Sequence, residues 1–166
     1  KKVIMEGDIV SIDAGVIYKD YHSDAARTWP VGKVSKEAEK LIEVTEQSFF
    51  EGIKLAKVGN HLHEISASIQ KYVESHDFSV VRDLVGHGIG RNMHEEPQIP
   101  NFKQINRGIR LAKGMTLAIE PMVNVGRFDV DWENDNWTVV TSDGSLSAHY
   151  ENTILITEGE AEILSL

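Results

Sequence analysis

Residues 9–30 read IVSIDAGVIYKDYHSDAARTWP, and this stretch decides the fold. Its first ten residues are mostly apolar or β-branched, which is typical of a buried strand. A polar turn follows, and then a second strand that ends at Pro30. If the turn centres on Tyr18–Lys19, Asp13 lies directly opposite Asp24 in an antiparallel pair. The sequence therefore predicts a hairpin that carries two aspartates on one face, with Cβ atoms about 5 Å apart.

The two aspartates of this hairpin need a partner of opposite charge. Asp13 lies between Ile12 and Ala14 in an apolar run, where an isolated charge is costly. Two neighbouring carboxylates also repel each other and raise one pKa. A solvated strand face or a cap is the ordinary alternative for such residues. Cations between the carboxylates would remove both costs, so the pair could clasp one ion or bridge two.

Three further residues of metal-ligand type lie in unusual surroundings. His87 belongs to GHGIGRNMHEEP, Glu120 to GMTLAIEPMVN and Glu151 to SAHYENTI. A glutamate among apolar strand residues requires a cation or a hydrogen-bond network. Four carboxylates and one imidazole suit two divalent cations of hard or borderline character. The sequence predicts a dinuclear metal site with the ligands Asp13, Asp24, His87, Glu120 and Glu151.

The glycine-rich stretch around His87 has a competing interpretation as a phosphate-binding loop. No GK[ST] follows it and no helix is predicted there, so the phosphate loop is disfavoured. A lone histidine is more often structural than functional. His94, seven residues further on, gives this loop a second histidine. Two histidines in one glycine-rich loop favour a functional role.

The remaining elements predict an α+β chain with a mostly antiparallel sheet. Ser35 can cap a helix whose apolar stripe continues to Ala56 and which ends at Gly59. Asn60 can cap a second helix. Further strands are predicted at residues 79–85, from Gly114 onward, and at 137–142, 148–157 and 161–165. The predicted order is two strands, then two helices, then further strands, which is typical of the α+β class.

Composition limits the possible functions. The 166 residues, 41% of them hydrophobic, predict one domain over 1–166. The net charge of -9 offers no basic patch to nucleic acid, and no apolar run approaches the ~18 residues that span a bilayer. The chain has no cysteine, which fits a reducing compartment. We therefore expect neither a nucleic acid partner nor a membrane span.

The four quoted motifs together resemble type I methionine aminopeptidase, a metal-dependent peptidase family with the pita-bread fold. They match in order and at compatible spacing, with all five ligand positions filled. The resemblance implies a curved antiparallel sheet with helices packed on its outer face. It also implies that Asp24 and Glu151 bridge two ions, and that His87 binds one of them. Glu120 would bind that ion and also carry a proton.

The resemblance also implies residues that contact the substrate. His94 would hydrogen-bond the substrate near the scissile amide. Trp137 and Met93 would wall the pocket for the methionine side chain. The two ions would be manganese, iron(II), cobalt or zinc, all of which accept this ligand set.

The function implied is removal of the N-terminal methionine from nascent proteins and peptides, by a cytoplasmic monomer close to the ribosome. The family carries a further histidine and part of its methionine pocket upstream of the first hairpin. Both would precede Lys1, so we expect the chain to lack the family's N-terminal part. Two alternatives remain: a proline-directed peptidase of the same fold, such as prolidase or aminopeptidase P, or an inactive truncated binding module.

Overall fold

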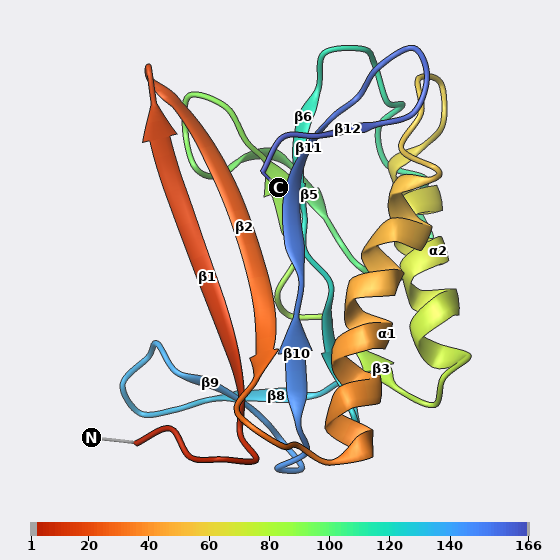
Figure 1. Ribbon diagram of the computed structural model, residues 1–166. Helices are drawn as coiled ribbons and strands as arrows, with labels where there is room; N and C mark the ends of the chain where they lie inside the picture. Colours follow the sequence, from red (N-terminus) through yellow and green to blue (C-terminus); the bar gives the residue numbers. More distant parts are fainter. Residues whose placement is uncertain (1–2, 166) are drawn as a thin grey trace.

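The computed structural model describes residues 3–165 and has the predicted α+β architecture, with every strand pair antiparallel (Figure 1). Its helices are α1 (Lys36–Ile53) and α2 (Leu62–Glu74). Its strands are β1 (Ile9–Tyr18), β2 (Tyr21–Pro30), β3 (Ser79–Val80), β4 (Gly86–Gly88), β5 (Glu95–Ile99), β6 (Thr116–Ile119), β7 (Met122–Asn124), β8 (Val130–Trp132), β9 (Val139–Thr141), β10 (Ser147–His149), β11 (Glu151–Leu155) and β12 (Glu162–Ile163).

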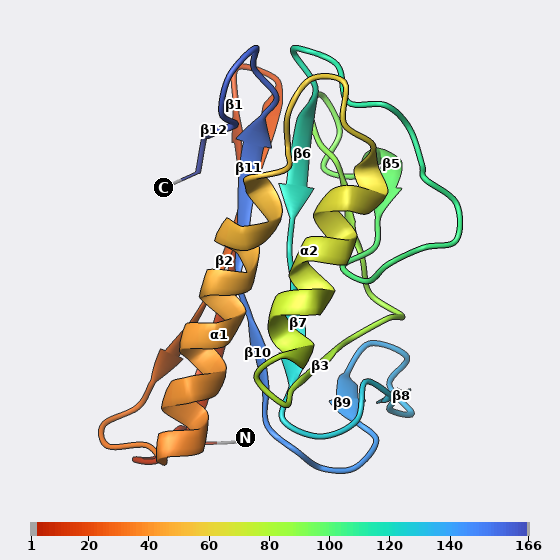
Figure 2. The ribbon, with the colours of Figure 1, turned by 90° about the vertical axis from the view of Figure 1, so that its right-hand side faces the viewer.

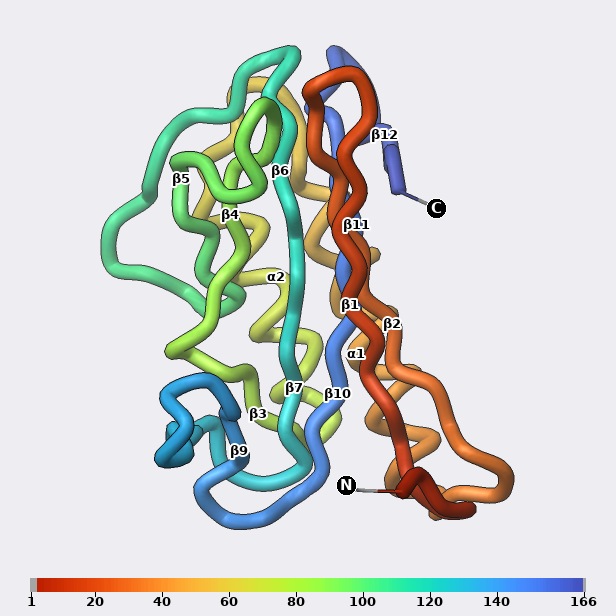
Figure 3. The backbone as a smooth tube through the Cα atoms, turned by 90° about the vertical axis from the view of Figure 1, so that its left-hand side faces the viewer, coloured from red at the N-terminus to blue at the C-terminus, as the bar shows by residue number. Residues whose placement is uncertain are grey.

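Most strands form one large sheet that continues into a smaller one, and β8 pairs with β9 in a separate two-stranded sheet. The large sheet has the order β1-β2-β11-β6-β4-β5, with β12 also paired to β11, and the smaller one has the order β10-β7-β3. A single register runs from Asn152 opposite Ile119 to His149 opposite Met122, and the backbone N–H of Tyr150 donates to Pro121 between them. Two long strand paths therefore lie side by side across the molecule (Figure 3).

The two helices lie together on one side of the sheet (Figure 2) and enclose the core. Helix α1 begins where the Ser35 hydroxyl accepts a hydrogen bond from the N–H of Ala38, as predicted. Its inner face buries Leu41 and Phe49 completely. Burial of each such side chain contributes roughly 1.5–3 kcal/mol. Among residues 3–165, no helix has the length and apolar character needed to cross a membrane.

The second helix begins one residue later than predicted. His61, not Asn60, is its N-cap, and the Glu64 carboxylate accepts from the His61 backbone N–H at 2.9 Å. This is the reciprocal arrangement of a capping box. Asn60 instead donates from its side chain to the carbonyl of Leu55 at 3.0 Å, which ties the connection back to the end of α1.

The first hairpin forms over the predicted residues, but its register differs. Asp24 lies opposite Gly15, not Asp13, because the turn centres on Lys19 and Asp20. Both turn residues have positive φ, 49° and 67°, as a two-residue turn requires when it follows the twist of its strands. Aspartate tolerates that conformation better than tyrosine, so the turn falls one residue later than predicted. A shift of two in pairing leaves Asp13 and Asp24 on the same face, now diagonal.

Three other expectations are corrected. Strand β1 is largely exposed at the edge of the sheet and is not a buried strand. Only Ser79–Val80 of the predicted strand at 79–85 pairs, and the strand predicted from Gly114 is interrupted at Glu120–Pro121, because proline cannot donate to the ladder. Strands β4, β5 and β8 were not predicted, because three of their residues are glycine or proline and two of the strands have three residues each.

Candidate metal centre

The register places the five predicted ligands in two neighbouring rows on one face of the sheet. In one row, Asp13 lies opposite Ala26, and Ala26 opposite Glu151. The uniform register of the two long strand paths puts Glu120 next in this row, across from Glu151. Successive side chains of a strand alternate between faces, so residues two apart share one. Asp24 therefore points to the same face as Ala26.

The second row adds the histidine. His87 lies opposite Ala118, and Ala118 opposite Thr153. Ala118 and Glu120 are two residues apart, so His87 shares their face. The Thr153 hydroxyl accepts from the backbone N–H of Asp24 at 2.9 Å and donates to its carbonyl at 3.1 Å, which closes the row. Ligand-type side chains from β1, β2, β4 and β11 and the residue after β6 thus meet on one surface.

Small side chains lie between these ligands. Ala26 separates Asp13 from Glu151, and Ala118 separates His87 from Thr153. Both alanines are fully buried. A larger side chain at either position would occupy the space between the carboxylates. Each of these two positions among the charged groups therefore carries only a methyl group.

The distances are those of a potential ion site. One ligand atom from each of Asp24, His87 and Glu151 lies within 4.8 Å of the other two. Nε2 of His87 is 3.5 Å from Oε1 of Glu120. Glu151 is 1% exposed, and its Oε1 has no hydrogen-bond partner within residues 3–165. A buried carboxylate oxygen without a partner is costly unless a cation satisfies it.

The carboxylates disfavour ionisation when no cation is present. Burial, with the charges of Asp13 and Asp24 second, raises the pKa of Glu120 to about 8. Burial and the neighbouring acids raise the pKa of Glu151 to about 9. Although Asp13 is exposed as a residue, partial burial of its carboxyl group and the charge of Asp24 raise its pKa to about 6. Divalent cations would reverse these shifts, because they stabilise the ionised form.

The ring of His87 is oriented for ligation. Its Nδ1 lies 2.8 Å from the carbonyl oxygen of Gly88, which can only accept, so Nδ1 carries the proton. Nε2 is then left with a free lone pair facing Glu120. Burial lowers the pKa of His87 and keeps the ring neutral, the form that binds a metal. The backbone carbonyl thus fixes the tautomer, as is usual for metal-binding histidines.

Two of the three predicted substrate residues lie beside this cluster. The ring of His94 is 4.4 Å from that of His87, centroid to centroid, and His94 is exposed. The methyl carbon of Met93 reaches Gly15 on β1, where a Cβ on that glycine would lie only 2.2 Å from it. Trp137 differs: it lies in the turn between β8 and β9 with 83% of its surface exposed. Its side chain is not packed against the cluster.

His149 also faces the cluster and was not predicted. Its Nε2 lies 3.7 Å from Oε2 of Glu120, and burial lowers its pKa to about 4. The sequence carried a signal that would have found it: His149 precedes Glu151 by two residues in one strand path, and such residues share a face.

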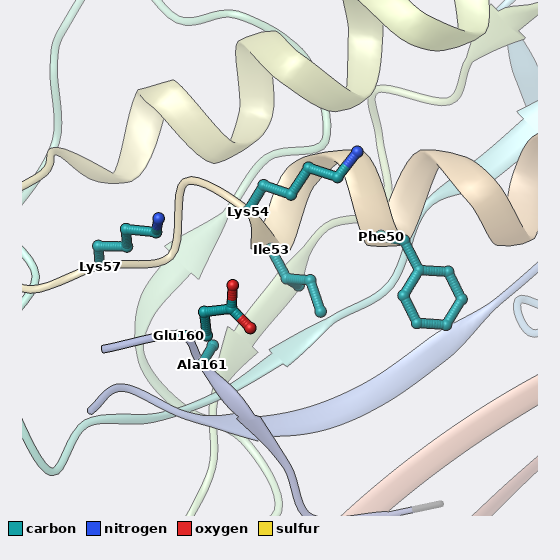
Figure 4. A pocket seen from close by; sticks show the side chains of 6 residues that line it. All are labelled: Phe50, Ile53, Lys54, Lys57, Glu160 and Ala161. Atoms are coloured by element: carbon teal, nitrogen blue, oxygen red, sulfur yellow. The ribbon is translucent and has the colours of Figure 1, made fainter. Parts of the chain in front are cut away.

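Two hollows differ in chemistry. One of about 350 Å³ adjoins the cluster and is lined by His87, His94 and acidic residues of β5. Another of about 260 Å³ lies at the end of α1, where Phe50, Ile53 and Ala161 line it together with Glu160 and two lysines, and Lys54 points away from Glu160 (Figure 4). None of the five predicted ligands lines the second hollow. Chemistry at the cluster would therefore use the first hollow.

The sequence pattern of metallopeptidase family M24 matches residues 1–158. The chain belongs to metallopeptidase family M24. It is 60% identical over 163 residues to a methionine aminopeptidase of Clostridium perfringens, and this alignment covers 98% of the chain and 66% of the relative. A methionine aminopeptidase 1 of Bacillus subtilis is 53% identical over 164 residues, with 99% and 66% covered. The chain spans about two thirds of the length of these curated relatives.

Solved structures agree with this M24 assignment. A methionine aminopeptidase from Thermotoga maritima superimposes with a TM-score of 0.96 at 51% identity, covering 99% of this chain and 66% of that one. A prolidase from Pyrococcus furiosus gives 0.79 at 26% identity, covering 99% and 43%. The predicted pita-bread fold is therefore confirmed, and the methionine aminopeptidases are the nearer of these two groups.

Proposed function

We propose that residues 1–166 form a single catalytic domain that removes N-terminal methionine from peptides and nascent proteins with the help of two divalent cations. The observation that carries this proposal is the convergence of five ligand-type side chains on one face of the sheet, in a chain 60% identical to a methionine aminopeptidase. The proposed ligands are Asp13, Asp24, His87, Glu120 and Glu151.

The donor set fits divalent cations. Oε1 of Glu151 has no hydrogen-bond partner within residues 3–165, and the pKa values of Glu120 and Glu151 are raised. Both observations indicate that these carboxylates have no nearby cation to balance their charge. Oxygen donors with one imidazole suit manganese, iron(II), cobalt or zinc. Such ions, when bound, supply a water of lowered pKa and polarise a carbonyl group.

The protein residues would then divide the remaining work. Glu120 accepts the proton of the attacking water and delivers it to the leaving amine, a role for which a raised pKa is suited. His94, next to His87, donates a hydrogen bond to the oxygen that gains negative charge. Met93 supplies an apolar wall for the methionine side chain. Trp137, exposed in the β8–β9 turn, would add to this wall from outside the cluster. These roles assign proton transfer, charge stabilisation and specificity to different side chains.

The nearest rival activity is cleavage next to proline. Prolidase shares this fold, but the chain is only 26% identical to the Pyrococcus furiosus prolidase, with a TM-score of 0.79. The corresponding values for the Thermotoga maritima methionine aminopeptidase are 51% and 0.96. The other rival is an inert binding module. A module that had lost catalysis would not need five ligand positions filled on one face, and here all five are filled.

Cellular setting belongs to the same proposal. Substrates with a free N-terminal methionine emerge from ribosomes, so we propose a cytoplasmic enzyme that works near them as a monomer. The absence of cysteine from the sequence is compatible with a reducing compartment. Light scattering on the purified chain tests the monomeric state.

Substrate choice tests the proposal. The chain is loaded in turn with manganese, iron(II), cobalt and zinc, and cleavage of Met-Ala-Ser is compared with cleavage of an X-Pro dipeptide. We expect metal-dependent release of methionine, its loss in Glu120→Ala and Glu120→Gln, and no loss in Glu158→Ala, a change at an exposed turn. Preference for X-Pro would establish the prolidase alternative. Stoichiometric metal without turnover on either substrate would establish the inert module.

A further inference from the structure

A third row of polar side chains lies directly beside the two rows of proposed ligands. Ser11 lies opposite Thr28 in the first hairpin, and their hydroxyl oxygens are 2.8 Å apart. The Thr28 hydroxyl donates to the carbonyl of His149 and accepts from its N–H, both at 2.8 Å. His149 lies opposite Met122. The row Ser11–Thr28–His149 therefore holds a histidine on the same face as Glu151 and Glu120.

The imidazole of His149 has an unused nitrogen. Nε2 is completely buried and has no hydrogen-bond partner among residues 3–165. A buried polar nitrogen without a partner costs free energy, so such groups in native proteins usually have a role. Oε2 of Glu120 lies 3.7 Å from this nitrogen, a few tenths of an ångström beyond a hydrogen bond. Contacts of this kind in enzyme sites tighten when the site is filled.

The two oxygens of Glu120 face two different imidazoles. Oε1 lies 3.5 Å from Nε2 of His87, a proposed metal ligand. Oε2 lies 3.7 Å from Nε2 of His149. The two nitrogens differ in chemistry, because the proton of His87 is on Nδ1, whereas Nε2 of His149 is free to carry one. Oε1 of Glu120 therefore faces the lone pair of His87, whereas Oε2 can accept a hydrogen bond from His149.

We propose that His149 is a positioning residue for Glu120: its Nε2–H donates to Oε2 and leaves Oε1 to share an ion with His87. The Thr28 hydroxyl holds the backbone of His149 at the required place. This inference rests on the proposed function, since it concerns the carboxylate assigned to proton transfer. With Oε2 engaged by His149, Oε1 of Glu120 would remain available to hold an ion beside His87.

The test compares two replacements of His149. His149→Gln retains an N–H donor, whereas His149→Leu fills similar volume without one. Cobalt(II) affinity is measured by calorimetry, the cobalt(II) absorption spectrum is recorded, and kcat and KM are determined with Met-Ala-Ser. Loss of a partner that orients a ligand typically costs 10- to 100-fold in metal affinity. We expect that loss and a lower kcat with little change of KM in His149→Leu, and recovery to within a few-fold in His149→Gln.

Controls separate this inference from the others. His63→Gln, at a half-buried position in the first turn of α2, should match the wild type. Thr28→Val leaves the imidazole of His149 intact but removes the hydroxyl that hydrogen-bonds the backbone of His149. It should lower cobalt(II) affinity several-fold, and it serves as the test if His149→Leu does not fold. Unchanged cobalt(II) affinity and kcat in both His149→Leu and Thr28→Val would overturn the inference. So would a loss in folded His149→Leu that glutamine fails to restore, since the ring itself would then be required. A wild-type chain that binds no cobalt(II) contradicts the proposed function instead.

Discussion

The helix-covered part of the sheet and the β1–β2 hairpin are held in place by different forces. Over β7 and β10, α1 and α2 bury a continuous apolar cluster that includes Phe49 and Ile65. The outer face of the hairpin carries large apolar side chains as well, but they are more than half exposed. They are Ile12, Val16, Tyr18, Tyr21 and Trp29. In Figure 1 the hairpin extends away from both helices.

The hairpin is instead fixed to its neighbours by polar contacts on both faces of the sheet. Only two residue pairs join β2 to β11 in the ladder. Arg27 donates to the side-chain oxygen of Asn152 at 2.7 Å and stacks on the ring of Tyr150 at 4.1 Å. The Thr153 and Thr28 hydroxyls add the contacts described above. One half of the molecule is thus stabilised by burial, and the other by hydrogen bonds and, as we propose, by metal ions.

The largest expected effect removes a ligand from the hairpin. Asp24→Ala should abolish turnover, because it deletes a proposed bridging carboxylate and leaves its partners repelling one another. Calorimetric titration with manganese should show loss of stoichiometric binding. Asp83→Ala, an exposed aspartate before β4, serves as the control and should bind as the wild type does. Unchanged activity with stoichiometric metal in Asp24→Ala would contradict the ligand assignment.

The next effect contrasts the two regions directly. Phe49→Ala should lower the free energy of unfolding by about 3–5 kcal/mol, because it empties a fully buried position. Ile12→Ala, at a side chain that is 56% exposed, should change it by no more than about 0.5 kcal/mol. Urea denaturation of both variants measures the difference. Equal losses would mean that the hairpin face is covered in solution.

Metal-free protein should lose stability as pH rises. Burial raises the pKa of Glu120 to about 8 and of Glu151 to about 9 from 4.5, so the folded state holds protons that the unfolded chain has released. The free energy of unfolding then falls as pH rises from about 4.5 to about 9. His149 acts oppositely and below about pH 6.5, since burial lowers its pKa from 6.5 to about 4.

Urea midpoints from pH 6.5 to 9 test this expectation. With a chelator present they should decline, and with saturating manganese the decline should shrink or reverse, because the ion binds the ionised carboxylates. A flat profile in chelator would show that the glutamates are solvated.

The smallest effect concerns a contact that ties the hairpin to β11. Thr153→Val keeps the shape but leaves the backbone N–H of Asp24 without its acceptor. A buried donor without a partner costs about 1–3 kcal/mol. Urea denaturation should show that loss, together with weaker manganese binding. If stability is unaffected, the hairpin is held mainly by its backbone ladder.

The sequence predicted those features whose physical cause is local. The first hairpin was found over its full length because strand residues flank a polar turn, and Ser35 was recognised as a cap. The register was missed because it depends on which two residues adopt positive φ, and the prediction centred the turn on Tyr18–Lys19, one residue too early. Strand β4 was missed because it is three residues long, with glycine at both ends.

The ligand types were predictable and their arrangement was not. Charged residues inside apolar strands stand out in a sequence, so all five proposed ligands were named. His149 was overlooked although it lies two residues before Glu151 in the strand predicted at 148–157, because its neighbour Glu120 is distant in sequence. Only the pairing of β10 with β7 brings it to that carboxylate. The exposure of Trp137 was also beyond sequence reasoning, since it depends on how the β8–β9 turn projects.

The two buried alanines between the ligands set the character of the whole face. Ala26 and Ala118 each contribute a single methyl group to a face that otherwise carries the proposed ligands and threonine side chains. Ala26→Leu would place a larger apolar side chain between the proposed ligands without removing any of them. Calorimetry should then show a folded protein that no longer binds divalent ions. Small side chains at these two positions are therefore as much a requirement of the proposed metal site as the ligands themselves.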